Sequence, residues 1–148
     1  MLNREKGVTF TEVMVTIAII GIIAAIAIPA YQNHIFSERL TGASQAIYAQ
    51  ALMAKRQSVS NNDTRYFKIE DDSGDWCAFV STTSDATCAT SLLYAHGRDF
   101  SGVTVSTGVT SIFVMPALTA TNVSAEITGE NGDTKTLWIF ENQRVVIE

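Results

Sequence analysis

The segment from Val13 to Tyr31 constrains this 148-residue chain more than any other feature. It is nineteen residues long, carries no charged side chain, and has Thr16 as its one clearly polar side chain. A helix rises about 1.5 Å per residue, so a run of this length is close to what crosses a hydrocarbon core of roughly 30 Å. The sequence therefore predicts a membrane-spanning helix near the N-terminus.

The residues around this run indicate its orientation and leave other kinds of apolar segment open. Arg4 and Lys6 precede it, and cationic flanks favour a cytoplasmic N-terminus, with the bulk of the chain on the outer face. A secretory signal peptide would instead be removed after the apolar run. Glu12 at the start of the run and a helical pattern that continues past Pro29 count against that reading. A plain signal anchor explains the span but gives no reason for a glycine five residues before Glu12.

The segment before the run, Lys6 to Glu12 with the sequence KGVTFTE, resembles the processing site of class III prepilins. The resemblance extends through Gly21 and Pro29, so the chain is similar to the type IV pilin and pseudopilin family. It implies that a prepilin peptidase recognises Lys6 and Gly7, cuts after Gly7 and N-methylates Val8. The mature chain would start with VTFTE, where family members more commonly have Phe-Thr-Leu-Ile before the glutamate.

Glu12 carries a charge at the edge of the membrane segment, and such a charge needs a partner. A carboxylate at the centre of a membrane helix costs about 2.5–3.5 kcal/mol on insertion scales, and less towards the ends. After cleavage the nearest cation is the α-amino group of Val8, on the same chain or on a neighbour, with Thr9 able to hydrogen-bond nearby. We therefore expect Thr9 and Glu12 to act in filament assembly. The alternative is a glutamate that only reaches the lipid headgroups.

Two residues weaken the apolar helix. Pro29 removes a backbone hydrogen bond and crowds the carbonyl four residues earlier, which predicts a kink. Gly21 lowers helix propensity at the other end of the same stretch. The resemblance to pilins implies local melting of this stretch in a filament.

An apolar stripe with helical spacing continues the helix beyond the membrane segment, and it predicts one helix from about Val8 to about Ser58. The stripe consists of Phe36, Leu40, Ala43, Ile47, Ala51 and Ala54. We expect it to be buried against a C-terminal domain. The predicted divisions are a leader at 1–7, a hydrophobic transmembrane and assembly helix at 8–31, its amphipathic half at 32–60, and a β-rich head at 61–148.

The head has strand character with glycine-containing breaks. Strands are predicted near 65–70, 76–81, 103–106, 110–115, 123–127, 136–141 and 144–147, with a hairpin at Glu141–Gln143. The resulting fold class is α+β, with the long helix packed against a mostly antiparallel β-sheet head. His96 is assigned to a loop. The acidic stretch Glu70–Asp75 lacks the spacing of a known calcium loop and reads as a solvated turn.

Charge and cysteine content narrow the classes of function further. Ten basic and fifteen acidic residues give a net charge of −5, which argues against binding nucleic-acid phosphates. Lys135 and Arg144 are isolated, so a DNA-capture module is a minor alternative. Cys77 and Cys88 suit a disulfide in an oxidising compartment better than a zinc site, although two free thiols stay possible.

No phosphate loop, metal-spaced histidine cluster or nucleophile motif is found, so we expect no enzyme activity, no cofactor and no metal. By resemblance the chain is most like the H-type minor pilins, because its helix at 44–60 is similar and its cysteine pair lies mid-chain. A pseudopilin of type II secretion is the main alternative, and a plain anchored periplasmic protein another. The implied partners are other pilin subunits, prepilin peptidase, the inner-membrane assembly platform and membrane lipid. The implied location is the bacterial inner membrane and then a filament.

Overall fold

The computed structural model describes residues 7–91, 94–115 and 119–148. Contacts divide the chain into two compact units, residues 1–35 and 36–148. The helix α1 spans Phe10–Asn61. The strands are β1 Arg65–Asp71, β2 Trp76–Ser81, β3 Tyr94–His96, β4 Val103–Val105, β5 Val109–Val114, β6 Thr119–Ala120, β7 Val123–Gly129, β8 Thr134–Ile139 and β9 Val145–Ile147, and two short 3₁₀ helices are η1 Cys88–Thr90 and η2 Gly97–Asp99.

The helix ends at Asn61, three residues beyond the predicted end at about Ser58. Asn62 adopts a left-handed conformation with φ of 49°. Its N–H bonds the carbonyl of Val59 at 3.4 Å, and the N–H of Asp63 bonds the carbonyl of Ser58 at 3.1 Å. This pair of bonds is the Schellman pattern, which satisfies the last helical carbonyls and stops the helix.

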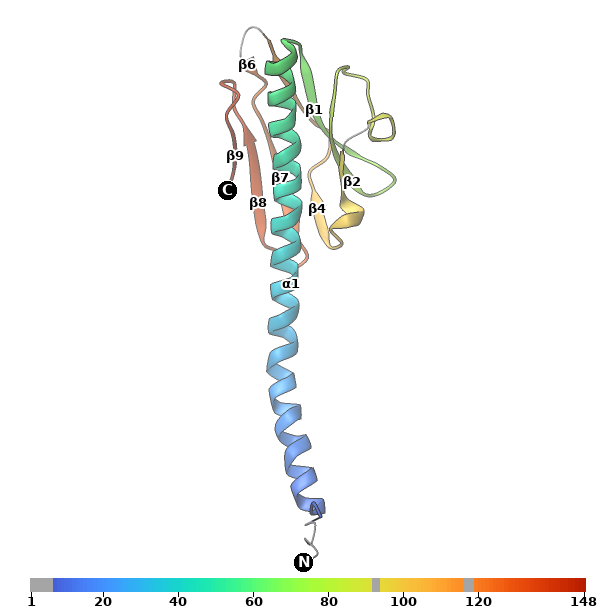
Figure 1. Ribbon diagram of the computed structural model, residues 1–148, viewed down its shortest axis with the longest axis vertical. Helices are drawn as coiled ribbons and strands as arrows, with labels where there is room; N and C mark the ends of the chain where they lie inside the picture. The colour runs from blue at the N-terminus through green and yellow to red at the C-terminus, as the bar shows by residue number, and fades with distance from the viewer. Residues whose placement is uncertain (1–6, 92–93, 116–118) are drawn as a thin grey trace, which may run out of the picture. The chain divides into compact units, whose positions relative to one another are not determined.

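The predicted antiparallel β-sheet head consists of two separate sheets. One is five-stranded in the order β3-β2-β1-β5-β6, and the other is four-stranded in the order β4-β7-β8-β9. Both lie along the C-terminal part of α1 (Figure 1). The division into two sheets follows from pairing partners that strand propensity does not encode: β5 pairs with β1 and β6, whereas β7 pairs with β8 and β4.

The predicted stripe on α1 forms the centre of the core. Leu40, Ala43, Ile47, Ala51 and Ala54 are each at most 2% exposed. They pack with apolar side chains from both sheets, among them Phe67, Ile69, Phe113, Ile127, Leu137 and Ile139. Three of these five residues are alanines, whose small side chains let the helix backbone approach the sheets closely. Phe36, the remaining member of the predicted stripe, is half-buried.

Polar bonds between residues far apart in sequence fasten the helix to the four-stranded sheet. The Lys55 ammonium donates to the carbonyl of Gln143 at 2.9 Å, and the Lys135 ammonium donates to the Thr41 hydroxyl at 3.3 Å. Residues 88 and 94 positions apart are thereby joined. Gln143 lies in the turn between β8 and β9, and that hairpin confirms the signal at Glu141–Gln143.

Candidate functional site

The start of α1 lies beside the predicted processing point. Gly7 and Val8 are exposed and precede the helix. The Thr9 hydroxyl accepts the backbone N–H of Glu12 at 3.2 Å, and the Thr9 carbonyl accepts the same N–H at 3.1 Å. Thr9 therefore acts as the helix N-cap. Lys6, the basic residue of the predicted processing site, lies outside the described residues.

Glu12 occupies the third position after this cap. The Thr-x-x-Glu spacing from Thr9 to Glu12 is that of a capping box. A carboxylate in the first turn also lies at the positive end of the helix dipole. The structure thus brings Thr9 and Glu12 together in one turn, where a single α-amino group placed close to them would meet a carboxylate and a capping hydroxyl.

The apolar part of α1 has the length and composition of a membrane span. A stretch of 18 residues within it is strongly apolar, and none of this stretch is buried within the protein. Large side chains such as Ile17, Ile22 and Ile26 are more than half exposed. The assignment rests on length and composition. The core helix of a soluble protein can have the same composition, but it would be mostly buried.

The two predicted weak points do not interrupt the helix in this structure. Gly21 and Pro29 both lie inside α1, which is helical throughout. A Cβ at Gly21 would meet no neighbouring atom within 4 Å, so nothing in the chain itself requires a glycine there. Bending or melting at these positions stays a prediction about the assembled or membrane-embedded state.

The predicted disulfide is present in the head. Cys77 on β2 and Cys88 on η1 are bonded, with their Cα atoms 6.2 Å apart. Both cysteines are buried beside Phe79. The loop that they close is also held by Lys68 of β1, whose ammonium donates to the carbonyls of Ser84 and Ala86 at 3.2 and 2.9 Å.

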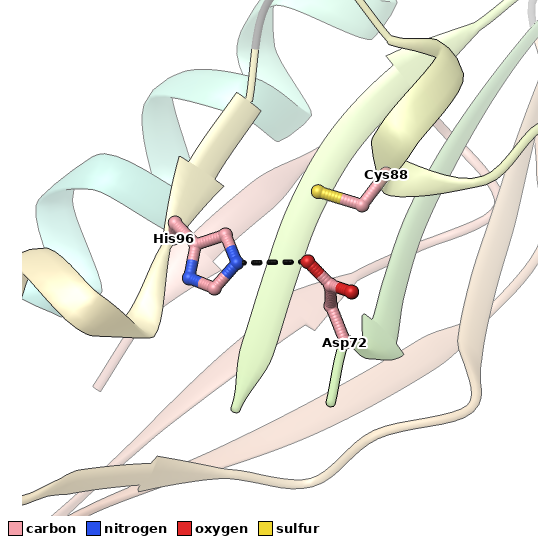
Figure 2. Close-up of side chains that lie close together, drawn as sticks. All are labelled: Asp72, Cys88 and His96. Carbon is pink, nitrogen blue, oxygen red and sulfur yellow. Dashed lines mark hydrogen bonds and ion pairs between the residues drawn. The ribbon is translucent and has the colours of Figure 1, made fainter. Parts of the chain in front are cut away.

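A polar cluster around His96 lies next to Cys88, one of the two disulfide cysteines (Figure 2). His96 Nδ1 accepts the backbone N–H of Arg98 at 3.3 Å, which leaves Nε2 to donate to the Asp72 carboxylate at 3.0 Å. This hydrogen bond from His96, supplemented by the charge of Arg98, holds the pKa of Asp72 below its ordinary value of 3.8 despite partial desolvation. The cluster binds the β1–β2 turn to the end of β3.

This arrangement corrects the assignment of His96 to a loop. His96 ends β3, which pairs with β2, and it is 6% exposed. A three-residue strand is too short to show alternation in the sequence. The partner of His96 lies 24 residues away, so no local signal could have found it.

The cluster also offers a test of metal binding. The ligand atoms of Asp72, Cys88 and His96 lie within 4.8 Å of one another. Metals take cysteine as the thiolate, and the Cys88 sulfur is committed to Cys77. His96 Nε2 is likewise engaged with Asp72, so the donor set does not fit a metal while the disulfide is formed.

The acidic turn next to it is closed by its own backbone and by polar bonds. Asp72 and Asp75 exchange two backbone hydrogen bonds, of 2.7 and 3.3 Å. Between them Ser73 and Gly74 have φ values of 62° and 90°, which is the pattern of a two-residue type I′ hairpin. Asp71 accepts the Gly74 N–H at 3.2 Å. The carboxylates of this turn thus serve the hairpin and the His96 cluster.

Comparison with known families gives a match at the N-terminus. Residues 2–28 match the family described as "Prokaryotic N-terminal methylation motif". The N-terminus of this chain is a class III prepilin signal. The matched segment contains Lys6, Gly7, Val8, Thr9 and Glu12, the residues singled out from the sequence.

Curated relatives of the chain include pilins. A type IV major alpha-pilin of Moraxella bovis is 50% identical over 48 residues, which cover 32% of this chain and 30% of the relative. A fimbrial protein of Pseudomonas aeruginosa is 36% identical over 44% of this chain and 48% of its own length. The chain therefore spans less than half the length of the curated relatives that it matches here.

Among solved structures, the type IV minor pilin FimU of Pseudomonas aeruginosa has the same fold. The TM-score is 0.61 with 17% identity, over 76% of this chain and 90% of FimU. The predicted α+β fold, one long N-terminal helix packed against antiparallel sheets, is confirmed as the pilin fold of FimU. Identity at this level carries the fold alone.

Proposed function

We propose that this chain is a structural subunit of a type IV pilus, and a minor subunit rather than the main one. The observation that carries the proposal is the prepilin signal at residues 2–28, on a chain whose fold is that of a minor pilin. The mid-chain disulfide Cys77–Cys88 agrees with the resemblance to minor subunits.

Processing is proposed to occur between Gly7 and Val8, with Lys6 contributing the basic residue that precedes the site. Both residues at the cut are exposed and lie before the first turn of α1, so a peptidase can reach non-helical backbone there. Val8 would then carry the new α-amino group and its methylation. Residues 1–7 are the leader in this scheme.

Assembly is proposed to depend on Glu12 and Thr9. Once Val8 is the first residue, a filament of parallel helices staggered along its axis brings the α-amino group of one subunit to Glu12 of another. In a low-dielectric environment this pair compensates a carboxylate that would otherwise be costly to bury. The Thr9 hydroxyl, already turned towards the Glu12 N–H, keeps the first turn helical at that contact.

The remaining parts take their roles from this scheme. Residues 8–31 span the bacterial inner membrane once, with a cytoplasmic N-terminus, before they join the filament core. Residues 32–60 present the stripe to the head at 61–148, which faces the periplasm. The partners are other pilin subunits, prepilin peptidase, the inner-membrane assembly platform and, before assembly, lipid. We expect the chain to act without a cofactor or catalytic site and without a nucleic-acid ligand.

The motif itself serves pilins and type II secretion pseudopilins alike, so an H-type pseudopilin is the alternative. The likeness to FimU, which is described as a type IV minor pilin, favours the pilus. Deleting the gene in its own host separates the two: a minor pilin changes the number of surface pili, and a pseudopilin changes the amount of secreted protein.

The direct test is to express the chain with and without prepilin peptidase and to measure its mass. The expected result is loss of Met1–Gly7 and a methyl group on Val8 only when the peptidase is present. A chain that keeps Met1–Gly7 with active peptidase contradicts the proposal and favours a plain anchor. A processed control pilin in the same cells shows that the peptidase is active.

A further inference from the structure

The strand β9 is an open edge of the four-stranded sheet. It pairs with β8 alone, and the sheet order β4-β7-β8-β9 places no strand beyond it in the described part of the chain. Thr136 exchanges two backbone hydrogen bonds with Glu148, and the Phe140 N–H bonds the carbonyl of Arg144. In an antiparallel pair such bonds recur at every second residue. The N–H and C=O groups of Val145 and Ile147 therefore point away from the sheet.

The opposite edge of the same sheet is protected, which sets β9 apart. On β4 the Val103 carbonyl accepts the Trp76 indole N–H at 3.0 Å, and the Val103 N–H bonds the carbonyl of Phe100 at 3.1 Å. Natural edges are commonly blunted by proline, lysine or a bulge. β9 has the sequence VVI in regular register, and none of these devices interrupts it.

An apolar groove runs beside this open edge. It has a volume of about 380 Å³ and is lined by Gln45 and Tyr48 of α1 and by Val145, Val146 and Ile147 of β9. A strand added next to β9 would direct alternate side chains into this groove. Main-chain bonds and side-chain pockets together are the elements of recognition by strand addition.

The charges around β9 indicate which strand fits. Its sequence with flanks is Arg144-Val-Val-Ile-Glu148, basic at one end and acidic at the other. A second copy running antiparallel and centred on Val146 would place each Arg144 opposite the other copy's Glu148. A parallel copy would place like charges opposite each other, which is destabilising. We propose that β9 pairs with β9 of a second copy of this chain and joins two four-stranded sheets into one.

This register agrees with the direction in which each residue points. Val145 and Ile147 of opposite copies become a hydrogen-bonded pair, and these are the residues whose backbone groups are free. Val146 meets Val146, and Arg144 meets Glu148, on the outer face of the sheet. Arg144 projects to that face in the single chain, since its guanidinium lies 5.9 Å from the ring centroid of Phe140.

The pairing also extends an exposed apolar row. Trp138 lies opposite Val146 on β8 and stacks on Phe140, with ring centroids 6.4 Å apart. Both aromatic side chains are 39% exposed. In the pair, the row Trp138–Val146 continues through the Val146 and Trp138 of the second copy. This row gives the contact an apolar centre with charged ends.

The two-fold symmetry of an antiparallel pair makes the two copies run in opposite directions, including residues 36–61 of α1. Subunits of one filament share a single direction. The contact therefore joins heads that approach from opposite sides. That these heads belong to two separate filaments rests on the proposed function. The pairing of β9 itself does not.

The test uses the full chain, reconstituted with one copy per lipid nanodisc, and counts nanodisc pairs by mass photometry over a range of protein concentrations. The wild type is expected to form pairs that weaken with salt. Arg144→Glu alone and Glu148→Arg alone are each expected to weaken pairing roughly tenfold, because two contacts per pair turn repulsive.

The decisive measurements combine the two charge substitutions. Arg144→Glu mixed with Glu148→Arg restores opposite charges at both contacts, and so does the double variant on one chain. Both are expected to pair like the wild type. A partner of any other kind would not be restored by this exchange. Failure of the mixture to pair overturns the proposal, as does a wild type that stays single at every concentration.

Two further variants test the role of the backbone hydrogen bonds and control for a change of charge elsewhere on the surface. Ile147→Pro removes an outward N–H while the β8 ladder keeps its bonds, and it is expected to abolish pairing. Arg56→Glu makes the same charge change at an exposed position on α1 and is expected to pair normally. Thermal unfolding of each variant shows whether its head is folded. A folded Ile147→Pro chain that still pairs overturns the proposal.

Discussion

The two parts of α1 share one backbone conformation and differ in where their contacts come from. Between residues 10 and 35 the apolar side chains are isoleucine- and valine-rich and exposed, as at Ile26, which is 71% exposed. Between residues 36 and 61 the apolar side chains form one stripe of small and branched residues, and Ile47 is fully buried. The second part thus obtains its partner from its own head, whereas the first part needs lipid or another subunit.

The largest effect is expected where the first part meets its outside partner. Glu12→Val should still insert into the membrane yet lose most of its incorporation into filaments. Breaking a buried ion pair by removing one partner typically costs about 3–5 kcal/mol. The measurement is the amount of subunit in sheared pili against the amount in membranes. Glu38→Val, at an exposed position of the second part, is the matched control. Normal incorporation of Glu12→Val would remove the assembly role.

A pair of identical substitutions tests the comparison directly. Ile47→Ala should lower the free energy of unfolding of the head by about 2–5 kcal/mol, because it empties a packed core position. Ile23→Ala should leave it unchanged. Denaturant unfolding of the full chain in detergent reports this through Trp76 and Trp138, which both lie in the head. Equal effects of the two substitutions would contradict the division between the two parts.

Loss of the disulfide should loosen the second part and spare the first. Replacing both Cys77 and Cys88 by alanine is expected to reduce head stability by about 2–3 kcal/mol for a loop of this size. Amide exchange should quicken across residues 36–61 and stay the same across residues 10–35. Reductant should reproduce the effect in the wild type and do nothing to the double variant. Faster exchange in the first part would show that the two parts are coupled.

The smallest effect is expected in how the stability of the head depends on pH through Asp72. Because the pKa of Asp72 is lowered in the folded state, its contribution to stability is complete above 3.8 and is lost as the pH falls through the lowered folded value. Asp72→Asn should therefore destabilise the head modestly at pH 7 and very little near pH 2. Urea midpoints at both pH values measure the difference. An equal loss of stability at both pH values would show that the substitution acts through something other than the ionisation of Asp72.

The sequence was most informative where a signal is local and periodic. The stripe from Leu40 to Ala54 repeats at helical spacing, and the Glu141–Gln143 hairpin joins adjacent strands, so both could be predicted. The prepilin signal was equally legible, because peptidase recognition reads a short linear segment. Thr9 and Glu12 owe their contact to a spacing of three within that segment.

The rest depends on contacts between distant residues. The division into two sheets follows from strand partners that propensity does not encode. His96 meets Asp72, and Lys68 meets the loop at Ser84 and Ala86, through the fold alone. The open edge at β9 also became visible only when the strand order was known. The opposite charges at the two ends of β9, Arg144 and Glu148, can by contrast be read directly from the sequence.

The bonds from Lys55 to Gln143 and from Lys135 to Thr41 have a consequence for the order in which the protein matures. Because the chain is synthesised from its N-terminus, the stripe on α1 is made long before β8 and β9, which cover it. Contacts of such large sequence separation form slowly, and apolar surface stays open until they do. The time between insertion of the apolar segment and arrival of the last hairpin is thus when the subunit is most vulnerable to proteases and to wrong partners.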